Sequence, residues 1–355
     1  MLTFTASTLR NINLNFNHGD ALSAPDYAIA LSVAKTLLYF DMFDFPLTAW
    51  EIYKYLWKDE SGAEVSFGRL QSVLKNYHVD FGEKDGFYFL NNKDHLIALR
   101  KQRQIIAAKK YKRAQIIAKI FSLFPFVEMI AVSNSLSYDN ARDDSDIDLF
   151  IITSDRKIWT ARFFSAAFLK IFHLRPNAYN KKNKICLNFF VTANALNLRQ
   201  LKENNDIYFI YWLHQLTPIY DAADLFSRFC QANSWIKNYI QAHDFNRINY
   251  QRRIKAGVIS RVVKKIFQIM LIFNFWEILF RSLQMKKMPD FIKNSMNKST
   301  NVVVNESTLK FHDQDRRAEF RHNWLVRCLK YENILKSASN QDARVNCSIN
   351  SPHDI

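Results

Sequence analysis

Two aspartates, Asp146 and Asp148, stand two residues apart at the start of an apolar run that continues with Leu149 and Phe150. Side chains two apart on a β-strand leave the same face, with Cα atoms roughly 7 Å from one another. Strand interiors normally avoid aspartate, so the pair needs a chemical reason. Hard divalent cations such as Mg²⁺ or Mn²⁺ prefer oxygen ligands. Because such ions can activate an attacking oxygen and neutralise a departing pyrophosphate, the pair predicts a metal-dependent nucleotide site.

Two other interpretations of the acidic pair compete with a metal site. Residues 138–145 form a polar turn of the kind that ends many strands, and the aspartates after it could simply be solvated. A calcium-binding EF-hand loop is excluded, because Leu149 stands where its Gly is required and Asp155 where its final Glu is required. The apolar run 126–132 and the small polar turn that follows it favour the metal site over the solvated turn.

This stretch resembles the signature of the DNA polymerase β-like nucleotidyltransferase superfamily. That signature is an apolar strand ending in Gly-Ser or Gly-Gly, a short intervening segment, and a strand that alternates acidic and apolar residues. Here Asn134 and Ser135 match the Gly-Ser position, and the run from Asp146 to Leu149 matches the acidic strand. The resemblance implies that Asp146 and Asp148 are catalytic and ligate Mg²⁺ or Mn²⁺. It also implies that Asn134 and Ser135 hold the phosphates of an NTP, with ATP the expected one.

Two positions depart from the signature. Asn134 stands where Gly is usual, but asparagine tolerates the left-handed backbone region better than most residues, so the turn can still form. The family's third carboxylate lies on a later strand, for which residues 185–191 are the best match and Asn188 the corresponding position. An amide is no general base. Two functions therefore stay open: an active enzyme, and a degenerate site that binds nucleotide without turnover.

Size and charge set wider limits. The chain has 355 residues, which suffices for two or three domains, and 48% of them are hydrophobic, which excludes disorder for most of its length. A net charge of +16 predicts anionic partners: nucleotide, nucleic acid or a membrane surface. With only six glycines, a Gly-rich phosphate loop is ruled out.

The cysteines and the apolar segments indicate the cellular compartment and whether the chain spans a membrane. The four cysteines show no paired spacing of a zinc site and are expected to be reduced thiols of a cytoplasmic protein. The N-terminus lacks a secretory profile. The most apolar stretch, residues 266–280, is too short and too polar to span a bilayer, so we expect a buried helix there and no transmembrane segment.

The N-terminal region after a loose lead-in (residues 1–24) reads as three helices followed by a hairpin, over residues 25–92. The helices are expected at 26–43, 47–57 and 66–77, with Thr48 and Glu51 forming a capping box and Gly82 to Gly86 supplying the hairpin turn. This order resembles a winged-helix domain. That resemblance implies that residues of the third helix would face the DNA major groove, and the candidates are Ser66, Arg69, Gln71, Ser72 and Lys75. We expect a structural role in preference to DNA readout.

Two segments are rich in cations. A long helix expected at 93–124 has eight Lys or Arg and no acid between residues 100 and 119, and residues 252–265 add six more without an acid. Such runs usually form solvated faces, but they could also guide a nucleic acid. On the long helix, Ile105, Ile106, Ile116 and Ile117 are spaced for one apolar stripe.

The rest of the chain completes an α+β protein. Residues 125–200 are expected to form a nucleotidyltransferase-like α/β domain with a small mixed sheet: strands 126–133, 146–152 and 185–191, and a helix at 157–173. Residues 201–336 are expected to form a helical domain, with helices at 207–215, 222–242, 255–285 and 316–335, and residues 337–355 a disordered tail. The expected function is transfer of a nucleoside monophosphate from an NTP to an unidentified acceptor; the alternative is a degenerate nucleotide-sensing or DNA-binding regulator.

Overall fold

The computed structural model describes residues 24–58, 64–76, 81–177, 179–241, 252–312 and 315–349. The expected lead-in, apart from its last residue, and the end of the expected tail lie outside these ranges. The chain divides into two compact units. The first comprises Met1–Arg100, Lys237–His243 and Glu319–Ile355, and the second comprises Lys101–Ile236 and Asp244–Ala318. Each unit has its own sheet, so the fold is of the mixed α+β class.

The first unit has the expected order of three helices and a hairpin. Its elements are α1 (Ala24–Asp41), β1 (Leu47–Thr48), α2 (Ala49–Tyr55), α3 (Phe67–Asn76), β2 (Phe81–Lys84) and β3 (Phe87–Leu90). The strands form an antiparallel sheet in the order β1-β3-β2, and β1 was not expected. The capping box is present, because Thr48 Oγ1 accepts from the Glu51 amide at 3.3 Å and Glu51 Oε2 accepts from the Thr48 amide at 2.9 Å. Gly86 turns the hairpin at φ +75°.

The long basic helix is confirmed as α4 (His95–Phe121). Its apolar stripe differs from the predicted one: Ile105 and Ile116 are exposed at 61% and 59%, whereas Ile117 is buried. The buried side combines large and small residues, and Tyr111, Ile117 and Phe121 are among the large ones. Its small members are Ala107, Ala114 and Ala118. The isoleucines therefore do not form one buried stripe, because Ile105 and Ile116 lie on the side of α4 opposite to the buried residues.

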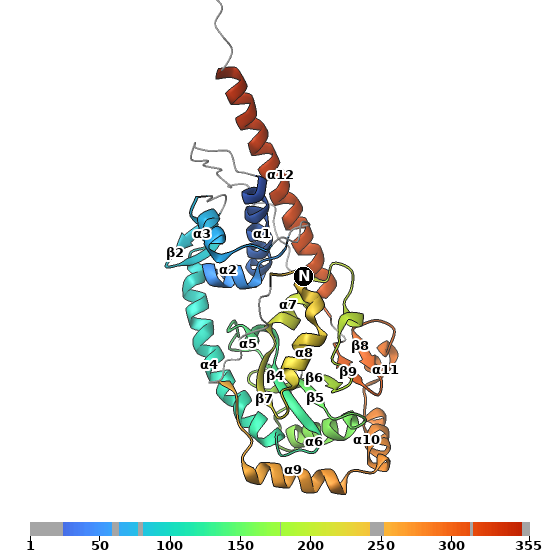
Figure 1. The fold of residues 1–355 in the computed structure, drawn as a ribbon. Helices are drawn as coiled ribbons and strands as arrows, with labels where there is room; N and C mark the ends of the chain where they lie inside the picture. The colour runs from blue at the N-terminus through green and yellow to red at the C-terminus, as the bar shows by residue number, and fades with distance from the viewer. Residues whose placement is uncertain are drawn as a thin grey trace, which may run out of the picture. The chain divides into compact units, whose positions relative to one another are not determined.

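The second unit is built on a six-stranded sheet in the order β7-β4-β5-β6-β9-β8 (Figure 1). The strands are β4 (Val127–Val132), β5 (Ile147–Thr153), β6 (Ile185–Thr192), β7 (Thr217–Asp221), β8 (Val302–Val304) and β9 (Thr308–Phe311). β5 and β6 run parallel and are joined through α6 (Ile158–Ile171), whereas the other neighbours are antiparallel. The sheet is therefore mixed, as expected, and the three predicted strands form its centre.

The region expected to be a helical domain also completes the central sheet. β7, β8 and β9 come from residues 201–336, and these strands are only three to five residues long, too short to show an alternating pattern. The helices of the region are α7 (Ile207–Gln215), α8 (Leu225–Ala232), α9 (Val258–Met270), α10 (Asn274–Lys286), α11 (Asp290–Ser295) and α12 (Arg317–Ile349). Of the four expected helices, that at 207–215 has the predicted bounds.

Two of the expected long helices are broken by buried polar side chains. The helix expected at 222–242 ends at Ala232, because the buried Asn233 accepts from the Leu198 amide at 2.9 Å and donates to the Leu196 carbonyl at 2.7 Å. The helix expected at 255–285 is divided into α9 and α10. There Lys157 Nζ donates to the carbonyls of Leu271, Ile272 and Phe273 at 2.7 to 3.2 Å, which ends α9.

The expectation of a buried helix at 266–280 is wrong. Ile266 is 52% exposed, Phe273 70% and Ile278 63%. Among the described residues no single helix is long and apolar enough to cross a membrane, and α9 and α10 pass that test only together, as a pair bent by 90°.

The expected disordered tail is helical over most of its length, since α12 continues to Ile349. No proline or glycine stands between Arg317 and Ile349 to end the helix, and Ala, Gln and Arg in this stretch favour it. Residues 350–355 lie outside the described part.

Candidate metal and nucleotide site

The two aspartates meet a third side chain beside the central sheet. Asp146 directly precedes β5 and Asp148 is the second residue of β5. Ligand atoms of Asp146, Asp148 and Cys186 all lie within 4.8 Å of one another. Both aspartates are partly exposed and Cys186 is buried. The pair predicted from its spacing is therefore a real cluster that solvent can reach.

The third member of the cluster is Cys186 and was not predicted. In the parallel register of β5 and β6, Ile147 pairs with Ile185 and Asp148 pairs with Cys186. Asn188, the predicted third-carboxylate position, lies two residues farther along β6, within a shift in this register, and pairing resumes at Phe189. Aligning the first apolar residues of the two strands would have indicated Cys186, but a strand's register is not visible in its own sequence.

The turn at Asn134 holds Asp148 from the other side. Asn134 has φ +56°, the left-handed conformation that its Gly-matching position predicts, and it begins α5 (Asn134–Ser137). The Ser133 amide donates to the backbone carbonyl of Asp148 at 3.1 Å. The Asn134 side chain hydrogen-bonds the Asp148 carboxyl and accepts from the Tyr208 hydroxyl at 3.3 Å. The asparagine therefore supplies the turn and also orients the carboxyl group.

Ser135 lies in the first turn of α5 and is partly exposed. Its carbonyl accepts from the Asn140 amide at 2.8 Å, which closes the loop that follows α5. The first amides of a helix have no acceptor within that helix. The Asn134-Ser135 turn therefore offers a partly exposed hydroxyl and backbone donors within the loop that also holds Asp148.

Burial and mutual repulsion make the acidic pair costly to ionise. Burial raises the pKa of Asp148 to about 7, and the charge of Asp146 adds to the effect, whereas hydrogen bonds from Asn134 and Cys186 act against it. Burial also raises the pKa of Asp146, against its own backbone hydrogen bond and the charges of Lys181 and Lys110. Two adjacent carboxylates with raised pKa values are an arrangement that a bound cation would relieve.

Cys186 is a poor metal ligand in this setting. Burial, together with the charges of Asp148 and Asp146, raises the pKa of the Cys186 thiol well above its usual value. The thiol therefore stays protonated at neutral pH, whereas metals bind the thiolate. Since thiolate suits soft cations and carboxylate suits hard ones, the two aspartates fit Mg²⁺ or Mn²⁺ and Cys186 adds nothing to that fit.

One cation of α4 positions the acidic loop. Lys110 is only 2% exposed, and its Nζ donates to the Ser145 carbonyl at 2.5 Å, to Asn183 Oδ1 at 3.0 Å and to the Asp143 carbonyl at 3.3 Å. Burial lowers the pKa of Lys110, and the nearby carboxylates of Asp143 and Asp146 oppose the shift. Lys110 therefore ties α4 to the segment that carries Asp146, rather than forming part of a solvated basic face.

The second basic segment is also largely committed to structure. Arg252 pairs with Asp139 at 2.9 Å, Arg253 with Asp221 at 2.6 Å and Lys264 with Glu128 at 3.1 Å. Three of the six cations in residues 252–265 therefore neutralise acids of the second unit. On α4, Lys109, Lys112 and Lys119 are exposed and remain open to an anionic partner.

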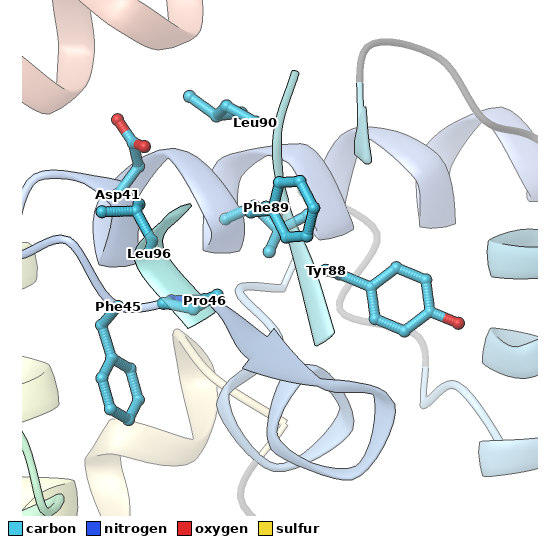
Figure 2. A pocket seen from close by; sticks show the side chains of 8 residues that line it. Asp41, Phe45, Pro46, Tyr88, Phe89, Leu90 and Leu96 are labelled. Atoms are coloured by element: carbon cyan, nitrogen blue, oxygen red, sulfur yellow. The ribbon is translucent and has the colours of Figure 1, made fainter. Parts of the chain in front are cut away.

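Figure 2 shows a pocket in the first unit, lined by residues of α1, the segment after it, the β3 hairpin strand and the start of α4. Its one charged lining residue, Asp41, pairs with Lys93 at 2.5 Å and with Arg327 at 2.6 Å. The carboxylate of Asp41 is therefore paired, and the other lining residues are uncharged.

No protein family model matches the chain, and neither a curated protein nor a solved structure matches it. The function is therefore inferred from the residues gathered around Asp146 and Asp148.

Proposed function

We propose that the protein is a metal-dependent nucleotidyltransferase that transfers a nucleoside monophosphate from an NTP to an acceptor. One observation carries the proposal: Asp146 and Asp148 lie together on one side of β5, beside a left-handed turn at Asn134 and Ser135. Phosphoryl-group chemistry needs positioning and charge neutralisation more than covalent catalysis. A carboxylate pair next to backbone donors meets both needs.

Each residue has a separate task in this proposal. Asp146 and Asp148 would hold Mg²⁺ or Mn²⁺, and a bound cation would neutralise phosphate charge during transfer. Ser135 and the first amides of α5 would bind phosphate oxygens. Asn134 keeps the Asp148 carboxyl oriented. We place this activity in the cytoplasm, and Cys186, Cys230 and Cys328 are free thiols, in keeping with a reducing compartment.

The first unit is proposed to be a winged-helix-like module with a structural role. This rests on the order of α1, α2, α3 and the β2-β3 hairpin, with β1 pairing β3.

Metal-dependent nucleotide binding is the direct test. We expect wild-type protein to bind ATP measurably tighter with Mg²⁺ than with EDTA, and the Asp146→Asn/Asp148→Asn variant to lose all of this difference, because the amides cannot hold the cation. Isothermal calorimetry with each of the four NTPs measures the affinity and the nucleotide preference together.

The matched control is Asp143→Asn/Asp144→Asn, which changes two exposed acids of the preceding loop and removes the same charge. Its metal-dependent binding should be that of wild type. Equal Mg²⁺-dependent ATP affinity of wild type and of the Asp146→Asn/Asp148→Asn variant would contradict the proposal.

A second function, a nucleotide sensor or DNA-binding regulator without turnover, is favoured by one observation. Cys186, not a third carboxylate, pairs in register with Asp148. The raised pKa of this thiol keeps it protonated, whereas the resemblance implies a carboxylate on this strand. The DNA-binding form of this alternative has weaker support. Ser66, Arg69, Gln71, Ser72 and Lys75 are all exposed, but Arg69 already pairs with Asp26 at 2.6 Å.

Replacing Cys186 separates the active and degenerate alternatives. We expect Cys186→Asp to tighten Mg²⁺ binding about tenfold, because it adds a third oxygen ligand to the pair. Asn188→Asp, the change that the sequence alone suggests, should leave Mg²⁺ affinity within about twofold of wild type. Calorimetric Mg²⁺ titration measures both variants, and Cys186→Ser is the size-matched control.

Pyrophosphate release from ATP then distinguishes the two functions. A degenerate wild type should gain turnover from Cys186→Asp, whereas an active wild type should be slowed or unchanged. Tighter Mg²⁺ binding by Asn188→Asp than by Cys186→Asp would contradict the register argument.

A further inference from the structure

The helix α9 presents its apolar side to solvent. Six large apolar residues on it are more than half exposed: Val258, Ile259, Val262, Ile266, Ile269 and Met270. Their spacing of three and four places them along one continuous face of the helix. An exposed apolar face of this extent on a folded protein marks an interaction site.

The side of α9 that faces the protein carries polar residues, and their contacts fix the orientation that leaves the apolar face outward. Lys264 is only 8% exposed, and its Nζ donates to the Val127 carbonyl at 2.5 Å and to Glu128 Oε2 at 3.1 Å. Ser260 and Gln268 are also partly covered. The helix is therefore oriented opposite to an ordinary core helix, with a buried cation holding it in place.

The apolar face continues through the turn into α10. Ile272 is 61% exposed, Phe273 70% and Phe275 63%. The turn is held from beneath, because Lys157 binds three of its carbonyls and Glu277 accepts from the Trp159 and Thr160 amides at 2.8 and 2.9 Å. In Figure 1, α9 runs along the border of the second unit and α10 turns away from its end. The exposed rings therefore belong to a firmly anchored corner.

Exposed cations border this face. Lys255, Arg261 and Lys265 are exposed and form no ion pair with a described residue, and the sequence has no acid between residues 252 and 276. Arg261 and Lys265 are four residues apart and so lie on one side of α9, next to the apolar row. An apolar strip beside unpaired cations matches the interface of a membrane with anionic lipids, in which acyl chains and headgroup charges lie side by side.

We propose that α9 and the turn into α10 dock the protein on the surface of an anionic lipid bilayer. At 13 residues α9 is about 20 Å long, too short to span the hydrocarbon core, so it would lie in the interface plane with its apolar side inward. Arg261 and Lys265 would contact lipid phosphates, and Phe273 would insert at the corner. This proposal does not depend on the proposed enzymatic function.

Flotation of the 355-residue protein with lipid vesicles tests the proposal. We expect binding to vesicles of phosphatidylcholine with about 30% phosphatidylglycerol, at least roughly tenfold weaker binding to pure phosphatidylcholine, and weakening with salt. Ile259→Asp/Ile266→Asp should reduce binding at least roughly tenfold, and Arg261→Gln/Lys265→Gln several-fold. The matched controls are Ile105→Asp/Ile116→Asp and Lys109→Gln/Lys112→Gln, which change exposed residues of α4 and should bind as wild type.

Several results would contradict docking of α9 on a lipid surface. No binding to anionic vesicles, or an equal loss in the α4 controls, would overturn the proposal. A dimer in sedimentation velocity that Ile259→Asp/Ile266→Asp dissociates would show that a second copy covers this face instead. Protein that stays with the vesicles after alkaline carbonate washing would have inserted α9 and α10, which would overturn docking at the surface.

Discussion

Asp148→Asn is expected to make the metal-free protein more stable at pH 8, by an amount on the order of a few kcal/mol, and to abolish its stabilisation by Mg²⁺. The pKa of Asp148 is raised to about 7 by burial and by Asp146, so ionisation of this carboxyl opposes folding. Asparagine keeps the acceptor for the Asn134 side chain but carries no charge. A gain in stability at the expense of ligand binding is the usual signature of a functional site.

The pH dependence follows from the direction of the shift. The pKa of an unfolded Asp is about 3.9, whereas native Asp148 keeps its proton up to about pH 7. Between these values the native state binds more protons than the unfolded state, so this group's contribution to stability falls as pH rises and then levels off. The stability gap between Asp148→Asn and wild type should therefore be small near pH 4, widen to pH 7 and stay constant above it.

Thermal denaturation from pH 4 to 9, with EDTA and with Mg²⁺, measures both effects. Asp290→Asn serves as the control, because its carboxylate is 89% exposed and its ion pair is with Lys293 on the same helix. That variant should follow wild type at every pH and respond to Mg²⁺. An Asp148→Asn variant less stable than wild type at pH 8 without metal would show that the carboxylate is structural.

Arg317→Met is expected to destabilise the protein by about 3 to 5 kcal/mol, because it leaves the buried carboxylate of Asp206 without its cationic partner, whereas Asp315 keeps its ion pair with Lys310. Arg317 is 4% exposed, and Nη1 donates to Asp206 Oδ2 while Nε donates to Asp315 Oδ2, each at 2.8 Å. Asp206 is itself 1% exposed. It caps α7 by accepting from the Phe209 amide at 3.1 Å. Losing Arg317 would therefore leave Asp206 charged and buried at the start of α7.

The same change should also weaken Mg²⁺ binding at the candidate site. Asp206 begins α7, and Tyr208 of α7 donates to the Asn134 side chain that orients Asp148. Urea denaturation followed by circular dichroism measures the loss of stability. Arg317→Lys should recover only part of it, because an ammonium group cannot reproduce the planar donor set. Arg142→Met is the control, because Arg142 is 68% exposed and its pair with Asp144 lies at the surface, so stability should change by about 0.5 kcal/mol or less. If Arg317→Met were as stable as this control, the ion pairs of Arg317 with Asp206 and Asp315 would not contribute to stability.

The sequence by itself determined the features that depend on neighbours along the chain. Spacing of two placed Asp146 and Asp148 together, the match of Asn134 to a Gly position predicted its left-handed backbone, and Thr48 with Glu51 predicted a capping box; the structure has all three. Periodicity also identified α4, α6 and α7 and the three central strands. These are local properties, set by side-chain direction and backbone preference within a few residues.

Only the tertiary structure decided the features that depend on pairing and packing between distant segments. The register of β5 and β6 puts Cys186, and not Asn188, opposite Asp148, because hydrogen bonding between strands fixes register. Strands β7, β8 and β9 join the sheet although each is too short to be recognised alone. The apolar side of α9 faces outward because Lys264 is bound by Val127 and Glu128, which lie far earlier in the chain. An amphipathic pattern defines two sides of a helix, but only its partners determine which side is buried.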